Sequence, residues 1–168
     1  VMGVQDGTRD PGSERVPAEA GRIADCMEEA VHAEEVGFDV DSVGEHHNPP
    51  FWSSCPPVFL AAVAARTTRL KLSTSTTLIT TNDPVRIAEE YALLQHICAG
   101  RNVMMLGRGN TAPVYPWFGN DISQGLPPAL ENYNLLHELW HRDVVAWKGS
   151  SRTPLQGLTS APRPLDDV

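Results

Sequence analysis

Residues 70–110, LKLSTSTTLITTNDPVRIAEEYALLQHICAGRNVMMLGRGN, decide the fold. The β-branched run Leu70–Thr80 predicts a buried strand. Asp83-Pro84 supplies an N-cap oxygen followed by a first-turn proline, so a helix is predicted from there to about Cys98, before a terminating glycine. Asn102–Leu106 predicts the next strand. A strand, a helix and a strand joined by short connections indicate a parallel βαβ unit.

The same alternation continues toward both ends of the chain. Four such units are half of a (β/α)8 barrel or most of a small doubly wound sheet, and periodicity alone leaves both open. Both architectures place ligands at the carboxyl ends of the strands. The remaining predicted elements are a strand at Val1–Gln5, a loop at Asp6–Val16, a helix from Pro17 to Gly37, a strand at Phe38–Val43, helices at Pro56–Ala65 and Pro127–Arg142, and a hairpin beginning at Val144–Trp147.

Composition places the chain among globular proteins and excludes several partners. Its 168 residues suit one domain and are fewer than the roughly 250 of a closed eightfold barrel. With 13 Lys and Arg against 21 Asp and Glu, a net charge of −8, it lacks the basic surface that nucleic acid requires. The longest uncharged apolar run, Val58–Ala65, is far shorter than the roughly 20 residues of a membrane span, and residues 1–15 are too polar for a signal peptide.

The cysteines and the chain ends give further expectations. Cys26, Cys55 and Cys98 lie far apart without a CxxC pair, which argues against a zinc ribbon or a disulfide framework. We expect them to be packing residues of a protein in a reducing cytoplasm. The sequence begins at Val1 inside a predicted strand and ends in a proline-punctuated stretch. We therefore expect one domain, residues 1–168, truncated at both ends and lacking mainly its C-terminal half.

Titratable side chains follow the second predicted strand, at Gly44-Glu45-His46-His47-Asn48. Histidine changes charge near neutral pH, so one of these rings is a candidate proton-transfer group. Adjacent residues of an extended strand point to opposite sides. His46 and His47 therefore cannot easily share a metal ion, and only one of them can face a barrel axis. The alternative is a pair of loop histidines that make structural hydrogen bonds.

Two other strand ends carry unusual sequence. Ser73–Thr77 is rich in hydroxyls where Val and Ile are usual in a parallel sheet, which indicates a polar group nearby or cross-strand Thr pairing. In Gly107-Arg108-Gly109-Asn110 the glycines would let the backbone approach a ligand while the arginine reaches an anion. This is not a dinucleotide fingerprint, because a third glycine and an immediately following helix are missing. A solvated turn arginine is the alternative.

A different chemistry is suggested by His137-Glu138-Leu139-Trp140-His141, which matches H-E-x-x-H on a predicted helix. The two histidines would share a face, and Glu138 could be the general base of a zinc hydrolase. The sequence offers no downstream glutamate as third ligand and lacks the metzincin continuation. The same spacing is typical of the solvated side of an amphipathic helix whose apolar side is Leu136, Leu139 and Trp140. We assign no residue to a metal.

Together these stretches make the chain resemble the bacterial luciferase-like monooxygenase family, which consists of flavin- or deazaflavin-dependent TIM-barrel oxidoreductases. The resemblance covers essentially the whole chain in the family's order and spacing, and it implies an α/β barrel cut after its fourth βα unit. The runs Tyr115–Gly119 and Arg152–Gln156 are similar to one FMN-using branch. The other segments that carry the resemblance are Ala33–Asp39, Gly44–His47, Asp83–Arg86 and Gly100–Asn110.

The resemblance also implies roles for particular residues. His46 matches the family's active-site histidine, a candidate general base or proton-transfer group beside the flavin. Ser75 and Thr76 match the position where relatives have a non-proline cis peptide that supports the isoalloxazine ring. Arg108 matches an arginine at the flavin or its phosphate, and Asn110 lies beside it. We therefore expect His46, Ser75, Thr76 and Arg108 to converge on one rim.

The implied reaction is the oxidation of a small organic substrate, such as an aldehyde or ketone, by dioxygen and FMNH2 from a partner flavin reductase. In the deazaflavin branch the event would be hydride transfer; the sequence leaves this open, although Tyr115–Gly119 favours FMN. Relatives usually dimerise, so a homodimer is implied, with the apolar helix Val58–Ala65 as a candidate interface. An unclosed barrel would leave strand edges uncovered, so a non-catalytic fragment or assembly module is the further alternative.

Overall fold

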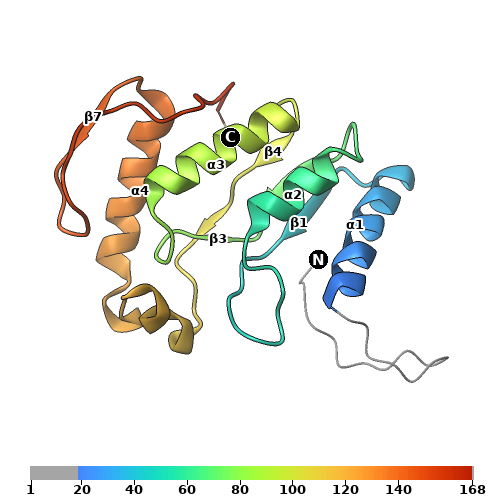
Figure 1. Cartoon of the computed structure of the whole chain (residues 1–168), viewed down its shortest axis with the longest axis horizontal. Helices are drawn as coiled ribbons and strands as arrows, with labels where there is room; N and C mark the ends of the chain where they lie inside the picture. Colours follow the sequence, from blue (N-terminus) through green and yellow to red (C-terminus); the bar gives the residue numbers. More distant parts are fainter. Residues whose placement is uncertain (1–18, 168) are drawn as a thin grey trace.

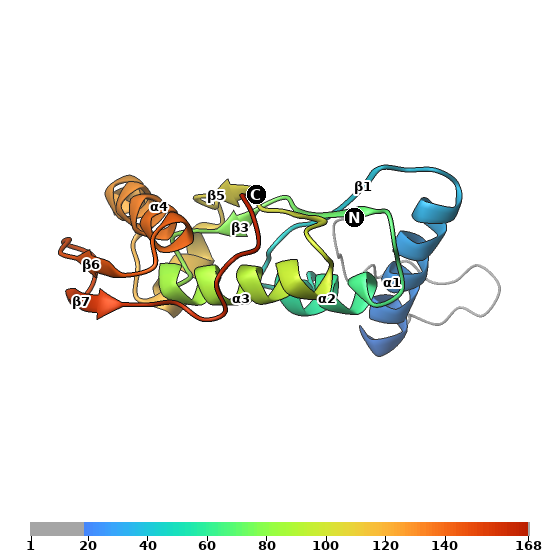
Figure 2. The ribbon, with the colours of Figure 1, turned by 90° about the horizontal axis from the view of Figure 1, so that it is seen from above.

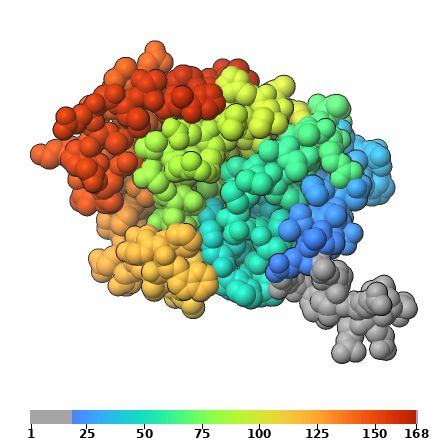
Figure 3. Space-filling view, viewed as in Figure 1, coloured from blue at the N-terminus to red at the C-terminus, as the bar shows by residue number. Residues whose placement is uncertain are grey.

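Helices and strands follow one another across the molecule in chain order, from α1 to β7 (Figure 1, Figure 3). The computed structural model of the chain describes residues 19–167, so the predicted strand Val1–Gln5, the loop Asp6–Val16 and the helix start at Pro17 lie outside the described residues. The elements are α1 (Glu19–Glu35), β1 (Val40–Val43), α2 (Pro56–Ala64), β2 (Lys71–Thr74), β3 (Thr77–Leu78), α3 (Pro84–Ile97), β4 (Asn102–Val103), β5 (Leu106–Gly107), the 3-10 helices η1 (Ala112–Phe118) and η2 (Ile122–Gln124), α4 (Leu126–His141), β6 (Val145–Trp147) and β7 (Leu155–Leu158).

The central strands pair in parallel, as predicted. β1, β2 and β4 form one sheet in that order, with Val40 opposite Lys71 and Leu72 opposite Asn102. β3 and β5 form a second parallel pair, and β6 and β7 form the antiparallel hairpin expected near the C-terminus. All of these sheets are open, and the described residues contain no closed barrel.

Two predicted strands are each interrupted. The strand predicted at Leu70–Thr80 is observed as β2 and β3, and the strand predicted at Asn102–Leu106 as β4 and β5. The hydroxyl of Thr74 lies at the interruption, where Oγ1 donates to the Met105 carbonyl (3.0 Å) and accepts from the Met105 amide (3.1 Å). A side chain thus replaces one step of the backbone ladder, so sequence periodicity overestimates the length of both strands.

The strand predicted from Phe38 begins two residues later, at Val40. The amide of Gly37 donates to the Glu34 carbonyl (3.2 Å), and the amide of Phe38 donates to the Ala33 carbonyl (2.9 Å). Gly37 has a φ of 94°, which permits this closure of the helix C-terminus. The residues before β1 therefore complete the end of α1 instead of extending the strand.

The apolar core lies between the strands and the helices. Figure 2 shows α2 and α3 on one side of the strands, and Leu60 of α2, Leu72 of β2 and Leu94 of α3 are fully buried between them. Cys26 and Cys98 are buried as well, as expected for packing residues. Cys55 is exposed, contrary to that expectation, because it occupies the N-terminus of α2.

The other side of the sheet is less covered by the described residues. Val40, Val103 and Met105 are 48%, 39% and 51% exposed, whereas the strand neighbours Asp41 and Asn102 are buried. Neighbouring residues of a strand point to opposite sides, so these three apolar side chains lie on the side away from α2 and α3. Separately, no helix in the described part of the chain is long and apolar enough to cross a membrane.

Candidate functional site

The first part of the candidate site is the end of β1. The loop after β1 folds back on itself, since Ser53 Oγ donates to the Gly44 carbonyl (2.6 Å) and the His46 amide donates to the Ser53 carbonyl (3.0 Å). Glu45 is buried, whereas the His46 ring lies beside Gly44, with Nε2 3.5 Å from the point where a Gly44 side chain would begin. Glu45 and His46 follow the end of β1, and the loop places the first in the interior and the second beside Gly44.

Ser75 and Thr76 occupy the next strand end, between β2 and β3. The peptide bond between them is cis, at the position where the family resemblance implies one. The Ser75 amide donates to the Val43 carbonyl (2.9 Å), and the Glu45 amide donates to the Thr76 carbonyl (3.2 Å). The backbone of this turn is thus joined directly to the end of β1, and His46, Ser75 and Thr76 come together there.

Two glycines pack closely against this turn. A side chain at Gly44 would start 2.9 Å from the Ser75 carbonyl oxygen, and one at Gly107 would overlap the Thr76 hydroxyl. Real side-chain carbons do not approach that closely, so both positions require glycine. The result is a backbone cradle at the carboxyl ends of β1, β2 and β5, the place where parallel α/β sheets bind ligands.

Arg108 and Asn110 follow Gly107 and are exposed. The Arg108 carbonyl accepts bonds from Thr80 Oγ1 (2.6 Å) and from the Tyr115 hydroxyl (2.5 Å), which fixes the backbone at this point. Among the described residues the Arg108 guanidinium has no hydrogen bond or ion pair. An unpaired guanidinium on the residue that follows Gly107 is suited to an anionic group, whereas the convergence of its side chain on His46 stays a prediction.

The electrostatic setting of His46 favours the neutral ring. Burial lowers its pKa below the usual value, while the Glu45 carboxylate opposes this shift. The ring stacks on Phe51, with 3.9 Å between ring centroids and 17° between planes. A neutral imidazole near pH 7 can accept a proton, as required of a general base.

The hydroxyl-rich run is mostly satisfied within the protein. Ser73 Oγ donates to the Thr74 carbonyl (3.3 Å), Thr74 bonds Met105 as described above, and Thr77 bonds the buried Tyr91 hydroxyl. Burial raises the pKa of Tyr91, so its hydroxyl stays protonated and available for this bond. Structural bonding thus explains three of these hydroxyls, and Ser75 and Thr76 are the ones left at the cradle.

Glu45, quoted in the sequence motif without a role, proves to be the most heavily bonded side chain of the site. Its side chain is 2% exposed and accepts bonds from His47 Nε2 (2.7 Å), Asn82 Nδ2 (2.8 Å) and the Leu78 amide (2.9 Å). The only sequence signal for this role is an acidic residue directly before a histidine. Leu78 and Asn82, which bond Glu45, lie 33 and 37 residues away and could not be predicted from the sequence.

The H-E-x-x-H motif lies on α4, and its geometry does not support a zinc site. The rings of His137 and His141 are 4.1 Å apart, but both ring nitrogens of His141 are engaged, by the His137 carbonyl (2.7 Å) and by Asp167 (3.1 Å). Glu138 pairs with Arg142 (2.6 Å). Within residues 19–167 no group of three His, Cys, Asp or Glu side chains is arranged to hold a metal ion.

Known proteins share this arrangement of elements. A solved monooxygenase from Streptomyces bottropensis superimposes with a TM-score of 0.83 and 27% identity, over 88% of this chain and 45% of that one. Limonene 1,2-monooxygenase from Rhodococcus erythropolis is 28% identical over 123 residues, which are 73% of this chain and 32% of that protein. An F420-dependent glucose-6-phosphate dehydrogenase from Nakamurella multipartita is 34% identical over 153 residues, 83% of this chain and 43% of that protein.

The chain thus spans less than half the length of these relatives. The family model described as luciferase-like monooxygenase matches residues 3–167. Because this match extends over nearly the whole chain, the protein belongs to the luciferase-like monooxygenase family, a family of oxidoreductases.

Proposed function

We propose that this chain contributes a flavin site at which reduced FMN and dioxygen oxidise a small organic substrate. One observation carries the proposal, namely that His46, Ser75 and Thr76, the residues to which the family resemblance assigns the flavin site, come together at the carboxyl ends of β1 and β2. In parallel α/β sheets this edge is where ligands bind. Family membership and the similarity to a limonene monooxygenase support the same class of reaction.

The residues around the cradle have complementary roles in this proposal. Ser75 and Thr76 hold the ring system, and the Arg108 guanidinium, with Asn110 beside it, binds the phosphate. Bound FMN would supply the electrons for the reduction of dioxygen. His46, whose pKa is lowered by burial, accepts a proton from the substrate side at Nε2, the ring nitrogen nearest to Gly44.

Flavin titration of the chain tests the cofactor site. FMN fluorescence is expected to be quenched saturably at micromolar concentrations, and Arg108→Ala should weaken binding about tenfold because a charged phosphate contact is lost. Arg142→Ala, which breaks only a surface pair with Glu138, is the matched control and should leave the affinity unchanged. Absence of saturable binding by the unaltered chain would refute the proposal.

The role of His46 has its own test. His46→Ala is expected to leave FMN affinity unchanged while slowing turnover of an oxidised substrate by about 100-fold or more, the usual contribution of a positioned base. Aldehydes and ketones are the substrates to screen, with a flavin reductase supplying FMNH2. Unchanged turnover would remove His46 from the mechanism.

Hydride transfer from a deazaflavin is the second candidate function. It is favoured by the 34% identity to an F420-dependent dehydrogenase. A competition experiment decides between the two cofactors, because both would occupy the same site. If coenzyme F420 displaces bound FMN at a lower concentration than unlabelled FMN does, the deazaflavin is the cofactor.

Two proposals concern the assembly. We propose that the four βα units contribute to a (β/α)8 barrel and that the protein acts as a homodimer. Val58 of α2 and Leu93 and Ile97 of α3 line a shallow apolar groove and are 69%, 51% and 49% exposed, which suits a helix–helix contact between subunits. Light scattering coupled to size-exclusion chromatography is expected to give a dimer, and Val58→Glu a monomer.

A further inference from the structure

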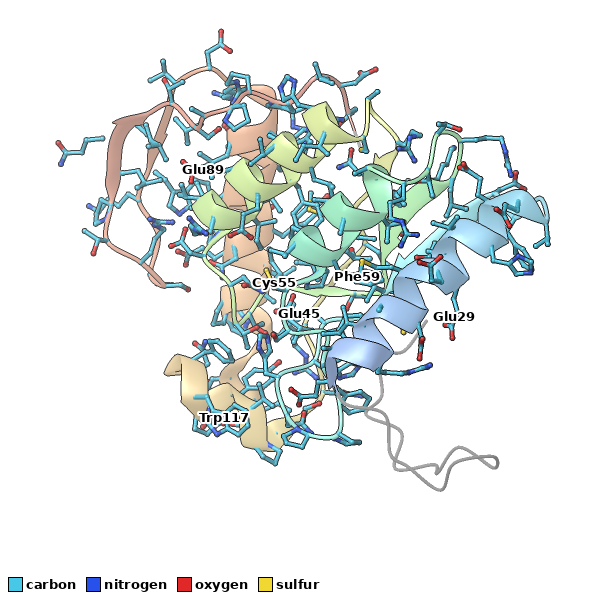
Figure 4. The ribbon with its side chains drawn as sticks, turned by 45° about the vertical axis from the view of Figure 1, so that its right-hand side comes forward. Glu29, Glu45, Cys55, Phe59, Glu89 and Trp117 are labelled. Carbon is cyan, nitrogen blue, oxygen red and sulfur yellow. The ribbon has the colours of Figure 1, made fainter. Side chains whose placement is uncertain are left out.

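Glu45 receives three hydrogen bonds from three different segments. His47 belongs to the loop after β1, Leu78 ends β3, and Asn82 precedes α3. The carboxylate oxygen Oε1 lies 2.7 Å from His47 Nε2 and 2.8 Å from Asn82 Nδ2, and Oε2 lies 2.9 Å from the Leu78 amide. Glu45 therefore joins three segments at the carboxyl end of the sheet, and Figure 4 shows it in the interior of the molecule.

These contacts determine where the His47 proton lies. A carboxylate can only accept hydrogen bonds, and the Leu78 amide can only donate. Asn82 must turn its NH2 group to Glu45, because the same nitrogen also faces the Leu78 carbonyl (2.9 Å), another acceptor. The remaining partner of Oε1 is His47 Nε2, so this nitrogen carries a proton.

The other ring nitrogen of His47 is then the basic one. In a neutral imidazole with hydrogen on Nε2, the lone pair lies on Nδ1. This atom has no hydrogen-bond partner among the described residues, and the side chain is 14% exposed. The arrangement of a carboxylate, an imidazole and a free basic nitrogen is the one by which enzymes orient a proton-transfer histidine.

His47 also lies next to the segment that follows Arg108. The Phe118 ring of η1 meets the His47 ring edge to face, with 4.7 Å between centroids. The same segment supplies Tyr115, whose hydroxyl bonds the Arg108 carbonyl, and the exposed Trp117, which Figure 4 shows at the edge of the molecule. His47 is therefore placed between the loop after β1 and η1, at the end of the sheet where the cradle lies.

We propose that Glu45 is a positioning residue that fixes His47 as the Nε2–H tautomer and thereby makes His47 Nδ1 a second proton-transfer atom of the site, distinct from His46. A proton leaving an acidic group of the substrate binds His47 Nδ1 and forms imidazolium, while the Nε2–H group keeps its hydrogen bond to the Glu45 carboxylate. The proton returns to the product or to water from the same atom. The identity of the transferred proton rests on the proposed function, whereas the tautomer does not.

Nuclear magnetic resonance of the histidine ring nitrogens in the uniformly 15N-labelled chain tests the proposal without any cofactor. At pH 8 His47 is expected to show a protonated Nε2 and an unprotonated Nδ1, and acidification should add the second proton at Nδ1. A wild-type spectrum with the proton on Nδ1 at pH 8 overturns the proposal, independently of any variant.

Glu45→Gln tests whether the carboxylate is the cause. The amide NH2 of glutamine needs an acceptor, and of the three partners only His47 can become one, by moving its proton to Nδ1. The variant is thus expected to shift most of the His47 population to the Nδ1–H tautomer. It should also lower the pKa of His46 further, because the opposing charge of Glu45 is lost. An unchanged His47 tautomer would contradict the proposal.

Glu34→Gln is the matched control. Glu34 also receives several backbone N–H bonds, from Thr68, Arg69 and Leu70, but it lies at the opposite end of the strands. Glu34→Gln should leave the His47 tautomer and the His46 pKa unchanged. If either one shifts in this variant, the effect of Glu45→Gln comes from a general loss of structure and the proposal is overturned. FMN titration of the same samples tests the proposed function separately, since loss of flavin binding with an intact Nε2–H tautomer contradicts only that function.

Discussion

Two motifs of this chain each combine one glutamate with two histidines, and they have opposite surroundings. At Glu45-His46-His47 the glutamate is buried and accepts three bonds, one of them from a backbone amide. At His137–His141 on α4, Glu138 pairs with Arg142 at the surface and His141 bonds a backbone carbonyl of its own helix. The residue types are the same, but only in the first motif is the glutamate joined to distant segments, since Glu138 pairs with Arg142 of its own helix end.

The difference comes from where each motif lies in the secondary structure. A helix satisfies its interior backbone groups internally, so Glu138 has no free amide of α4 to accept from. A strand end leaves amides and carbonyls free, and neighbouring strands bring theirs to the same edge. Glu45 can therefore collect donors from β3 and from the loop before α3. The buried carboxylate at the strand end thus has partners that Glu138 on α4 lacks.

Replacing each glutamate by leucine gives the largest expected contrast. Glu45→Leu removes the acceptor of three part-buried donors and should lower the free energy of unfolding by about 2–4 kcal/mol. Glu138→Leu breaks only a surface pair and should change it by no more than about 0.5 kcal/mol. Urea unfolding followed by circular dichroism measures both, and equal losses would show that the two motifs are equivalent after all.

The glycine cradle should be nearly as sensitive. In Gly107→Ala the new carbon overlaps the Thr76 hydroxyl, which should cost about 1–3 kcal/mol of stability through overpacking. FMN affinity should fall as well, because Thr76, which is proposed to hold the ring, must move. Gly21→Ala in α1 meets no atom within 4 Å and is expected to match or exceed the wild-type stability. A variant Gly107→Ala that binds FMN normally would place the ring elsewhere.

Lowering the pH should reduce the stability contributed by His46 and by Glu34, at the two ends of the sheet, in separate pH ranges. Burial lowers the pKa of His46, so the unfolded state takes up a proton first and stability falls as pH drops below the unfolded value of about 6.5. Bonds from the Thr68 and Leu70 amides lower the pKa of Glu34 to about 2 in the folded state. The stability that Glu34 contributes is therefore fully present above its unfolded pKa of about 4.3 and is lost as the pH falls from 4.3 to about 2.

Urea unfolding at pH 8, 5.5 and 3 follows both steps. His46→Gln should reduce the loss between pH 8 and 5.5 and leave the later loss intact. Glu34→Gln should leave the first loss intact and reduce the later one, to which Glu131 also contributes because its pKa is lowered to about 2 as well. A profile of His46→Gln that is indistinguishable from wild type above pH 5 would mean that His46 titrates equally in the folded and unfolded states.

The smallest effect is expected at α4. His141→Ala removes exposed bonds to the His137 carbonyl and to Asp167, so stability should change by no more than about 0.5 kcal/mol. Elemental analysis of the unaltered protein should find no stoichiometric zinc. If the unaltered protein contains one zinc ion per chain and His141→Ala contains none, this motif is a zinc site after all.

The sequence alone determined the local elements. The order of strands and helices, the N-cap at Asp83, whose Oδ1 accepts from the Val85 amide (2.8 Å), and the closing glycine of α1 all follow from residues within one or two turns of each other. It also indicated the strand ends as the functional edge, and the resemblance indicated His46, Ser75 and Thr76, which the structure brings together.

Only the tertiary structure decided how the polar groups are shared. Thr74 interrupts its strand through a contact with Met105, 31 residues away, and Glu45 reaches Leu78 and Asn82 at separations of 33 and 37 residues. Periodicity reports which side of an element is buried, but a hydrogen bond requires a particular partner within about 3 Å. That partner is fixed by packing between strands, which no local stretch of this sequence encodes.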